Sequence, residues 1–362
     1  MRAAVTTIAS FEITCRRFLD PEGRATGSLP AFARDPGALL PLYRSMVLTR
    51  IFDAKAISLQ RTGRLGTYPS CLGQEAVGVG LASAMRPEDV LFPSYRDQPA
   101  QLWRGVSPVE ILLYWGGDER GSDFAGPRRD FPISVPVGSQ APHAVGVALA
   151  MKLRGEPRVA VCCIGDGGTS KGDFYEAINL AGAMRLPAVF MVANNQWAIS
   201  VPRAAQTGAQ TLAQKAIAAG IPGEQVDGND VIAVADAARR AVDAARAGAG
   251  AALIEALTYR LGDHTTVDDA RRYREDSEVS RQWELEPIGR LRTYLVGMGA
   301  WTKAEEEQLL AECTAQVNAA VNAYLAMAPE PPTAMFDHLF EKLPVELAEQ
   351  RQAVMAEDSD HA

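Results

Sequence analysis

The segment from Val159 to Pro202, VAVCCIGDGGTSKGDFYEAINLAGAMRLPAVFMVANNQWAISVP, has the pattern of a strand, a helix and a second strand. The apolar, β-branched run from Val159 to Ile164 predicts a buried strand that ends at a glycine-rich turn. Asp173 is a candidate N-cap for the helix that follows. Apolar residues continue it at helical spacing, namely Phe174, Ala177, Ile178 and Ala181. A second apolar run, Ala188 to Ala193, ends at Asn194-Asn195, and such a unit predicts a parallel sheet.

Polar side chains follow both predicted strands at their carboxyl ends. Asp166 and Asn195 are 29 positions apart in the sequence. Ligands of open parallel sheets bind beyond the carboxyl ends of the strands, so a carboxylate and an amide oxygen should lie close together there. Mg²⁺ takes about six oxygen ligands and usually accepts several of them from phosphate and water. Gly165, Gly167 and Gly168 would let the backbone approach such a phosphate.

Composition limits the class of protein. The chain has 362 residues, of which 47% are hydrophobic and 22% charged, as in globular proteins of one large domain or two. A net charge of −8 gives no basic surface for nucleic acid. No segment approaches the roughly 18 apolar residues of a membrane span, and the N-terminus lacks the apolar core of a signal peptide. We therefore expect a cytoplasmic protein with five free cysteines, in which Cys162 and Cys163 point to opposite faces of a strand.

The rest of the chain suggests three parts. We expect a loosely ordered arm over residues 1–35, an α/β domain with C-terminal helices over 36–345 and a frayed polar tail over 346–362. An apolar stripe predicts a helix from Pro36 to Arg61, whose start Pro41 should delay by a turn. An irregular segment is expected over 116–136. Further helices are expected over 75–85, 107–115, 141–153, 231–246, 278–297 and 302–328, and further short strands before Phe92 and over 251–257.

Two more candidates lie beyond predicted strands. Tyr95 and Arg96 are adjacent, so on a loop both could reach one phosphate, although the dipeptide alone favours an ordinary surface pair. His264 follows the strand predicted over 251–257, on the side of the sheet that should carry Asp166 and Asn195. The alternative for His264 is a loop histidine bound only to water.

The chain resembles a known family. Gly-Asp-Gly, 26 residues and then Asn-Asn is the signature of thiamine-diphosphate enzymes. Over residues 36–345 the sequence is similar to alpha subunits of the heterotetrameric 2-oxo acid dehydrogenase first component. The motifs that carry this resemblance are RLGTYPSCLGQEA, FPSYRD, VPVGSQ, IGDGGTSKGDFYEA, NNQWAIS, QVDGNDV and TYRLGDHTTVDDARRYR.

The resemblance implies a doubly wound, mostly parallel sheet that holds thiamine diphosphate and Mg²⁺ between alpha and beta subunits. Such an enzyme decarboxylates a 2-oxo acid and passes the acyl group to a lipoyl-lysine of an acyltransferase component. The implied Mg²⁺ ligands are the side chains of Asp166 and Asn195 and the main-chain carbonyl of Trp197. The implied cofactor contacts are Tyr95, Arg96, Gly167 and Gly168 for the diphosphate, the main chain of Val137 for the aminopyrimidine, and His264, the catalytic residue, over the thiazolium ring.

Two features concern what the chain lacks. Members of this family usually carry a second histidine in the loop before the VGSQ-like motif, whereas no histidine occurs between Arg96 and Pro142, and His143 lies on a predicted helix. The glutamate that activates the aminopyrimidine belongs to the beta subunit. The chain should therefore be inactive alone and active in a two-plus-two assembly, with the small-residue helices 75–85 and 141–153 as candidate interfaces.

Several functions remain in competition. Pyruvate is the expected substrate, because RLGTYPS, GDGGTSKGDFYE and LAQKAIAAGIPG look like pyruvate-type subunits, whereas NNQWAIS is closer to branched-chain ones. The close alternative is a branched-chain (2-oxoisovalerate) dehydrogenase alpha subunit, and acetoin cleavage is a further one. A catalytically silent assembly subunit is suggested only by the absent histidine. A nicotinamide-binding domain would need G-x-G-x-x-G, and the third glycine is lacking.

Overall fold

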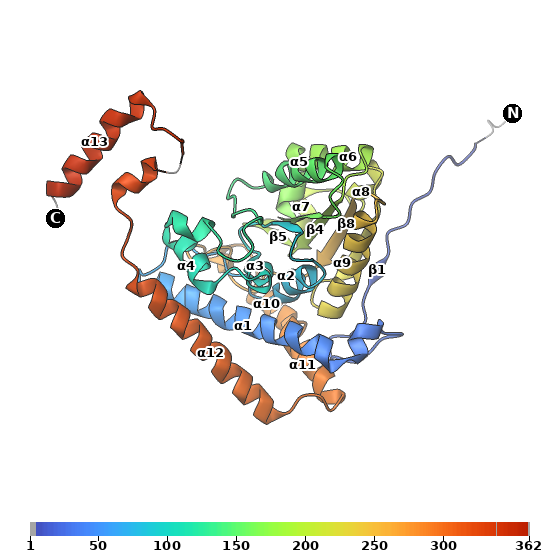
Figure 1. Ribbon diagram of the computed structural model, residues 1–362. Coiled ribbons are helices and arrows are strands. Elements are labelled where there is room, and N and C mark those ends of the chain that lie inside the picture. The colour runs from blue at the N-terminus through green and yellow to red at the C-terminus, as the bar shows by residue number, and fades with distance from the viewer. Residues whose placement is uncertain (1–4, 338, 361–362) are drawn as a thin grey trace. The chain divides into compact units, whose positions relative to one another are not determined.

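A six-stranded parallel sheet forms the centre of the fold in the computed structural model, which describes residues 5–337 and 339–360 (Figure 1). Its strand order is β1-β7-β8-β4-β3-β2. The strands are β1 (Cys15–Arg16), β2 (Val90–Phe92), β3 (Ala160–Gly165), β4 (Ala188–Asn194), β7 (Gly223–Asp227) and β8 (Ala252–Leu257). Helices flank the sheet on both faces, so the predicted α/β class with a mostly parallel, doubly wound sheet is confirmed.

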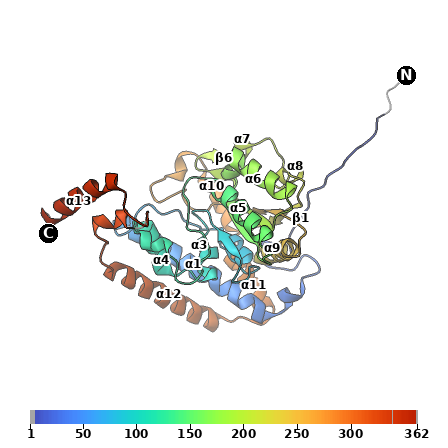
Figure 2. The same ribbon diagram turned by 45° about the horizontal axis from the view of Figure 1, so that its top comes forward.

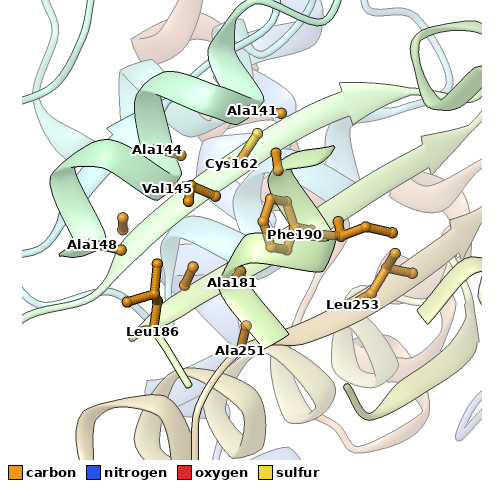
Figure 3. Packing of buried hydrophobic residues seen from close by; sticks show 14 of the residues in the cluster. Ala141, Ala144, Val145, Ala148, Cys162, Ala181, Leu186, Phe190, Ala251 and Leu253 are labelled. Atoms are coloured by element: carbon orange, nitrogen blue, oxygen red, sulfur yellow. The ribbon is translucent and has the colours of Figure 1, made fainter. Parts of the chain in front are cut away.

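The unit predicted around the glycine-rich turn is present as β3, α6 (Gly172–Ala183) and β4. Lys171 occupies the N-cap position of α6, whereas the candidate cap Asp173 lies in the first turn and pairs with Lys171 at 3.1 Å. Cys162 packs under α5 (Gln140–Leu153) and α6 (Figure 3), whereas Cys163 belongs to the cluster on the opposite face, as expected. All five cysteines are free thiols.

Two helical layers enclose the sheet. Helices α5 and α6 lie side by side over one face (Figures 1 and 2). The other face is covered by α2 (Glu75–Ala82), α3 (Gln98–Arg104) and α9 (Val231–Arg246). Every residue of α2 is buried within the chain, with Gly78 against Pro99 and Gly80 against Val234. The expectation that helix 75–85 meets a partner subunit is therefore wrong for α2, because its small residues are used for packing inside the chain.

Helix α1 (Pro36–Arg61) has the predicted bounds, but Pro41 does not delay its start. The Asp35 carboxylate accepts a hydrogen bond from the amide of Gly37 at 2.9 Å and caps the first turn. Pro41 lies on the exposed face, where water can satisfy the carbonyl that its missing N–H leaves unpaired. With α11 (Pro287–Gly297) and α12 (Lys303–Ala326), α1 forms a third apolar cluster that includes Leu42, Met46, Leu291 and Cys313.

From Cys15 onward, the N-terminal segment differs from the loosely ordered arm expected over 1–35, of which residues 1–4 lie outside the described residues. Strand β1 pairs with β7, and the buried Asp230 carboxylate accepts hydrogen bonds from the amides of Phe18 and Leu19 at 2.7 and 2.8 Å. Leu19 is fully buried. Residues 15–35 are therefore part of the packed structure, although the two-residue β1 is too short to leave a periodic signal in the sequence.

The C-terminal part also departs from expectation. The single helix predicted over 278–297 is two helices, α10 (Asp276–Trp283) and α11, because Glu286 caps α11 and Pro287 takes its first position. Residues expected to form a frayed tail form α13 (Val345–Asp360). One compact unit ends at Val321, and a second one begins at Asn322 and contains α13 and the 3₁₀ turn Pro332–Phe336. The domain boundaries expected at 35/36 and 345/346 stay a prediction.

The remaining elements are short. They are the two-stranded pair β5 (Trp197–Ala198) and β6 (Val201–Pro202), the helices α4 (Pro108–Gly116), α7 (Arg203–Gln206) and α8 (Lys215–Ala218), and the 3₁₀ turns at 31–34, 119–122, 167–170 and 270–272. Ser107 caps α4 as predicted, and the segment expected to be irregular over 116–136 is so from residue 117 on, apart from its 3₁₀ turn. Within the described residues, no helix is both long and apolar enough to span a membrane.

Candidate active site

A cavity of about 710 Å³ lies beyond the carboxyl ends of β2, β3, β4 and β8. Each of these strands is followed by a segment that lines the cavity. The structure thereby brings together every residue singled out from the sequence, namely Tyr95, Arg96, Val137, Gly165, Asp166, Gly167, Gly168, Asn195, Trp197 and His264. Residues up to 169 positions apart in the chain thus form the wall of one cavity, as the parallel sheet predicts.

Asp166 is a buried carboxylate between two turns. Its amide donates to the carbonyl of Ala193 at 3.3 Å, which joins the ends of β3 and β4. Its Oδ2 accepts a hydrogen bond from the side chain of Gln206 on α7 at 3.1 Å. Burial, the dominant effect, raises the pKa of Asp166. A cation at this place would lower that pKa again, because it stabilises the charged carboxylate.

Two glycines of the turn after β3 leave no room for a side chain. A Cβ at Gly167 would lie 2.5 Å from the Cβ of Ala198, and one at Gly168 would lie 2.6 Å from Cγ1 of Ile164. Gly165 differs, because a Cβ there would meet no other atom of the chain. Packing therefore requires glycine at 167 and 168, and the backbone of both residues faces the cavity.

Asn195 and Trp197 lie on the tight turn after β4. Gln196 and Ile199 adopt left-handed φ values of 73° and 57°, which are unusual for residues other than glycine. The Asn195 amide group donates to Oε1 of Gln74 at 3.1 Å, and its Oδ1 accepts from the amide of Trp197 at 3.2 Å. The turn thereby places an amide oxygen and a main-chain carbonyl beside Asp166 at the cavity wall.

These donors fit a magnesium ion bound to a phosphate. One carboxylate, one amide oxygen and one carbonyl oxygen leave coordination positions for phosphate and water, as Mg²⁺ prefers. Nε2 of Gln74 is buried at the cavity wall and has no hydrogen-bond partner in the described residues. Its N–H groups are therefore available to donate to a ligand. No group of three His, Cys, Asp or Glu side chains that could hold a metal occurs anywhere in the described part of the chain, this cavity included.

Two guanidinium groups, those of Arg96 and Arg260, lie beside His264. Arg96 is buried, donates to the carbonyls of Ser70 and, at 2.9 Å, of His264, and lies against the ring of Tyr95. Arg260 donates to the hydroxyl of Tyr273 at 2.7 Å and to the carbonyl of Trp197 at 3.4 Å. Neither guanidinium has a carboxylate partner within 4.0 Å among residues 5–337 and 339–360. The cavity therefore suits an anion.

His264 faces both guanidinium groups through the same ring nitrogen. Nδ1 lies 3.3 Å from a nitrogen of Arg96 and 3.3 Å from a nitrogen of Arg260. Guanidinium nitrogens can only donate, so Nδ1 is an acceptor and the ring proton resides on Nε2. Burial and the two arginine charges lower the pKa of His264 to about 4. The imidazole is thus neutral at pH 7 and presents an N–H donor at Nε2.

Sequence reasoning missed three residues that shape the site, namely Gln74, Gln206 and Arg260. Arg260 stands four positions before His264 within a motif already noted, which was a usable signal. No signal in the sequence pointed to Gln206, because only the folded chain brings its side chain to Asp166. Of the histidines in the described residues, His264 alone lines the cavity, whereas His143 is exposed on α5 beside Phe131, so it does not replace the absent loop histidine.

The state of His264 can be measured directly. In the purified chain with ¹⁵N-labelled histidine, we expect His264 to titrate near pH 4 and to carry its proton on Nε2 above that pH. Arg260→Gln should move the pKa toward 6.5, the ordinary value, because one repelling charge is lost. NMR-detected titration of the ring nitrogens tests both outcomes. A wild-type pKa near 6.5, unchanged in Arg260→Gln, would contradict the assigned arrangement.

The same shift has a consequence for stability. The unfolded chain takes up a proton on this histidine below about pH 6.5, whereas the folded chain does so only near pH 4. The contribution of His264 to stability is therefore complete above pH 6.5 and is lost as the pH falls toward 4.

Known proteins are similar in sequence to most of this chain. Residues 43–332 match the family model described as dehydrogenase E1 component. A pyruvate dehydrogenase E1 component subunit alpha of Staphylococcus aureus is 42% identical over 322 residues, which cover 89% of this chain and 87% of the relative. A 3-methyl-2-oxobutanoate dehydrogenase subunit alpha of Mycobacterium tuberculosis is 48% identical over 270 residues, 75% of this chain and 74% of the relative. The chain belongs to the dehydrogenase E1 component family.

Proposed function

We propose that this chain is the alpha subunit of a thiamine-diphosphate-dependent 2-oxo acid dehydrogenase that decarboxylates pyruvate and transfers the acetyl group to a lipoyl-lysine of an acyltransferase component. The observation that carries the proposal is that Asp166, Asn195, Trp197, Arg96 and His264 line one cavity. Family membership and the pyruvate dehydrogenase relatives support the same function.

The proposed metal site uses the oxygens of Asp166, Asn195 and Trp197 for Mg²⁺. Gln206 holds one oxygen of the Asp166 carboxylate, which leaves the other oxygen for the ion. Gln74 holds the amide group of Asn195 and so turns its oxygen away from Gln74. The role of the ion is to neutralise the diphosphate and to fix its position.

The diphosphate would lie between this ion and Arg96. Arg96 and the hydroxyl of Tyr95 are the proposed donors to its oxygens, and the main chain of Gly167 and Gly168 is its close neighbour. Gly165 and Val137 line the same wall, with Val137 toward the expected aminopyrimidine. Thiamine diphosphate, when bound, supplies the nucleophile and the electron sink for decarboxylation.

His264 is the proposed catalytic residue of this chain. Because its proton resides on Nε2 and Nδ1 faces two arginines, it acts as a neutral hydrogen-bond donor at the reacting centre. The role resembles a neutral electrophile more than an imidazolium acid.

The proposed partner is a beta subunit in a two-plus-two assembly. The chain contains one Gly-Asp-Gly to Asn-Asn unit and no repeat of it, so another polypeptide must hold the aminopyrimidine and supply its glutamate. Helix α5 keeps an exposed face that includes Pro142, His143, Gly146 and Leu153 and remains a candidate interface. The lipoyl acyltransferase component and a cytoplasmic location belong to the same proposal.

A branched-chain 2-oxo acid is the second candidate substrate. The relative from Mycobacterium tuberculosis named for 3-methyl-2-oxobutanoate has the higher identity of the two, although over a shorter part of the chain. Both functions use the same residues of this chain.

Loss of the carboxylate at the proposed metal site should abolish cofactor binding. In the assembly of this chain with its beta subunit, Asp166→Ala should bind thiamine diphosphate so weakly in the presence of Mg²⁺ that calorimetry detects no heat, because the diphosphate charge is not neutralised. Asp173→Ala, which changes an exposed carboxylate outside the cavity, is the matched control and should bind normally. Wild-type affinity in Asp166→Ala would remove Asp166 from the site.

The assembly and the substrate can be tested together. The purified chain alone should not decarboxylate any 2-oxo acid, and co-expression with its beta subunit should yield a two-plus-two assembly with activity. We expect a higher kcat/KM for pyruvate than for 3-methyl-2-oxobutanoate in a lipoyl-acylation assay. The reverse order would assign the branched-chain function. Turnover by the chain alone, free of beta subunit by mass spectrometry, would overturn the dependence on a partner.

A further inference from the structure

Glu255 is a fully buried carboxylate in the middle of β8 that does not line the cavity. Its Oε1 accepts a hydrogen bond from the side-chain amide of Asn194 at 2.6 Å, and its Oε2 accepts from the main-chain amide of Ala213 at 3.0 Å. A carboxylate enclosed in a parallel sheet is unfavourable unless such donors satisfy it. Both of its partners lie in segments that lead to the cavity.

The bond from Asn194 to Glu255 fixes the turn that carries Asn195 and Trp197. Because the Asn194 amide nitrogen is held by Glu255, its Oδ1 points the other way and accepts from the main chain of Gln196 at 3.3 Å and from its side chain at 2.8 Å. Gln196 has a φ of 73°, a conformation that persists only where surrounding contacts hold it. Glu255 thus supports the unusual backbone of this turn.

Lys215 makes the corresponding contact with the turn that carries Asp166. This lysine on α8 is 5% exposed, and its Nζ donates to the carbonyl and the hydroxyl of Thr169 at 2.6 and 2.8 Å. The Thr169 hydroxyl in turn donates to the main-chain carbonyl of Asp166 at 2.7 Å. Lys215 does not line the cavity either, so it cannot contact a ligand there.

The short segment 213–215 connects Glu255 with Lys215. Ala213, whose amide is bound by Glu255, lies two positions before Lys215. The segment 213–215 is therefore anchored to β8 at one end and to the turn after β3 at the other. Through Asn194, the same carboxylate also holds the turn after β4. The two turns that carry the candidate metal ligands are joined behind the cavity by these hydrogen bonds.

We propose that Glu255 and Lys215 are positioning residues that hold the turns after β3 and β4 in the relative placement needed to bind a divalent cation. The inference rests on the proposed function, because the cation is the Mg²⁺ of that site. Packing alone would be served as well by apolar side chains of similar volume, which often replace buried charges without loss of stability. The use of charged groups here is explained by the directed hydrogen bonds that each makes to one turn.

The test compares Mg²⁺ affinities of Glu255→Gln and Lys215→Met with wild type in the alpha–beta assembly. Calorimetric titration with MgCl₂ at a fixed excess of thiamine diphosphate should show affinity about 10–100-fold weaker in both variants, the usual effect of losing a residue that orients metal ligands. Far-UV circular dichroism should be unchanged. Activity should return at high Mg²⁺ concentration, which a general loss of structure would not allow.

Matched controls come from a buried ion pair elsewhere in the chain. Arg290 and Asp227 pair at 2.7 Å, and within the described residues no hydrogen bond or ion pair joins either of them to the two turns. Arg290→Met and Asp227→Asn make the same chemical changes and should lower the melting temperature without changing Mg²⁺ affinity. Equal affinity in all four variants and wild type would overturn the inference, as would equal weakening in the controls.

If Glu255→Gln or Lys215→Met fails to assemble with the beta subunit, two further variants test the inference. Thr169→Val removes only the hydroxyl between Lys215 and Asp166, and Asn194→Ala removes the link from Glu255 to Gln196. Each should weaken Mg²⁺ binding, and wild-type affinity in either would overturn its half of the inference. Failure of the wild-type assembly to bind Mg²⁺ would instead contradict the proposed function.

Discussion

The register between β3 and β4 is the constraint on which the candidate site depends. The two strands pair in parallel from Ala160 with Ala188 to Gly165 with Ala193. Both strands therefore end at the same edge of the sheet. Asp166 and Asn195 follow directly. A shift of one residue would turn each side chain of one strand to the other face and would separate the two donors. The alternation that buries Cys162 and Cys163 on opposite faces opposes such a shift.

Charges of both signs lie at the cavity. The carboxylate of Asp166 follows β3, and the guanidinium groups of Arg96 and Arg260 lie beside His264. An anionic ligand that carries its own cation would suit both kinds of charge, because the cation would meet the carboxylate and the remaining negative charge would meet the guanidinium groups. Burial and the same two arginines lower the pKa of His264, so the groups that would bind the anion also keep the proposed catalytic residue neutral.

The structure could be predicted from the sequence wherever a local pattern or the end of a strand determined it. The bounds of α1 and α9, the parallel unit around α6 and the meeting of Asp166, Asn195 and His264 at one cavity could all be predicted. Elements too short to show a periodic pattern, such as β1, could not be predicted. The break between α10 and α11 depends on the cap that Glu286 provides and on Pro287 at the first position of α11. Contacts such as Gln206 with Asp166 arise from long-range packing and leave no mark in spacing.

The position of the metal tests the central claim most directly. Crystals of the alpha–beta assembly grown with thiamine diphosphate and Mn²⁺ in place of Mg²⁺ would locate the ion by its anomalous scattering. The account predicts one peak within about 2.0–2.3 Å of a carboxylate oxygen of Asp166, Oδ1 of Asn195 and the carbonyl oxygen of Trp197. A cofactor-bound assembly whose metal peak lies away from these three oxygens would contradict it.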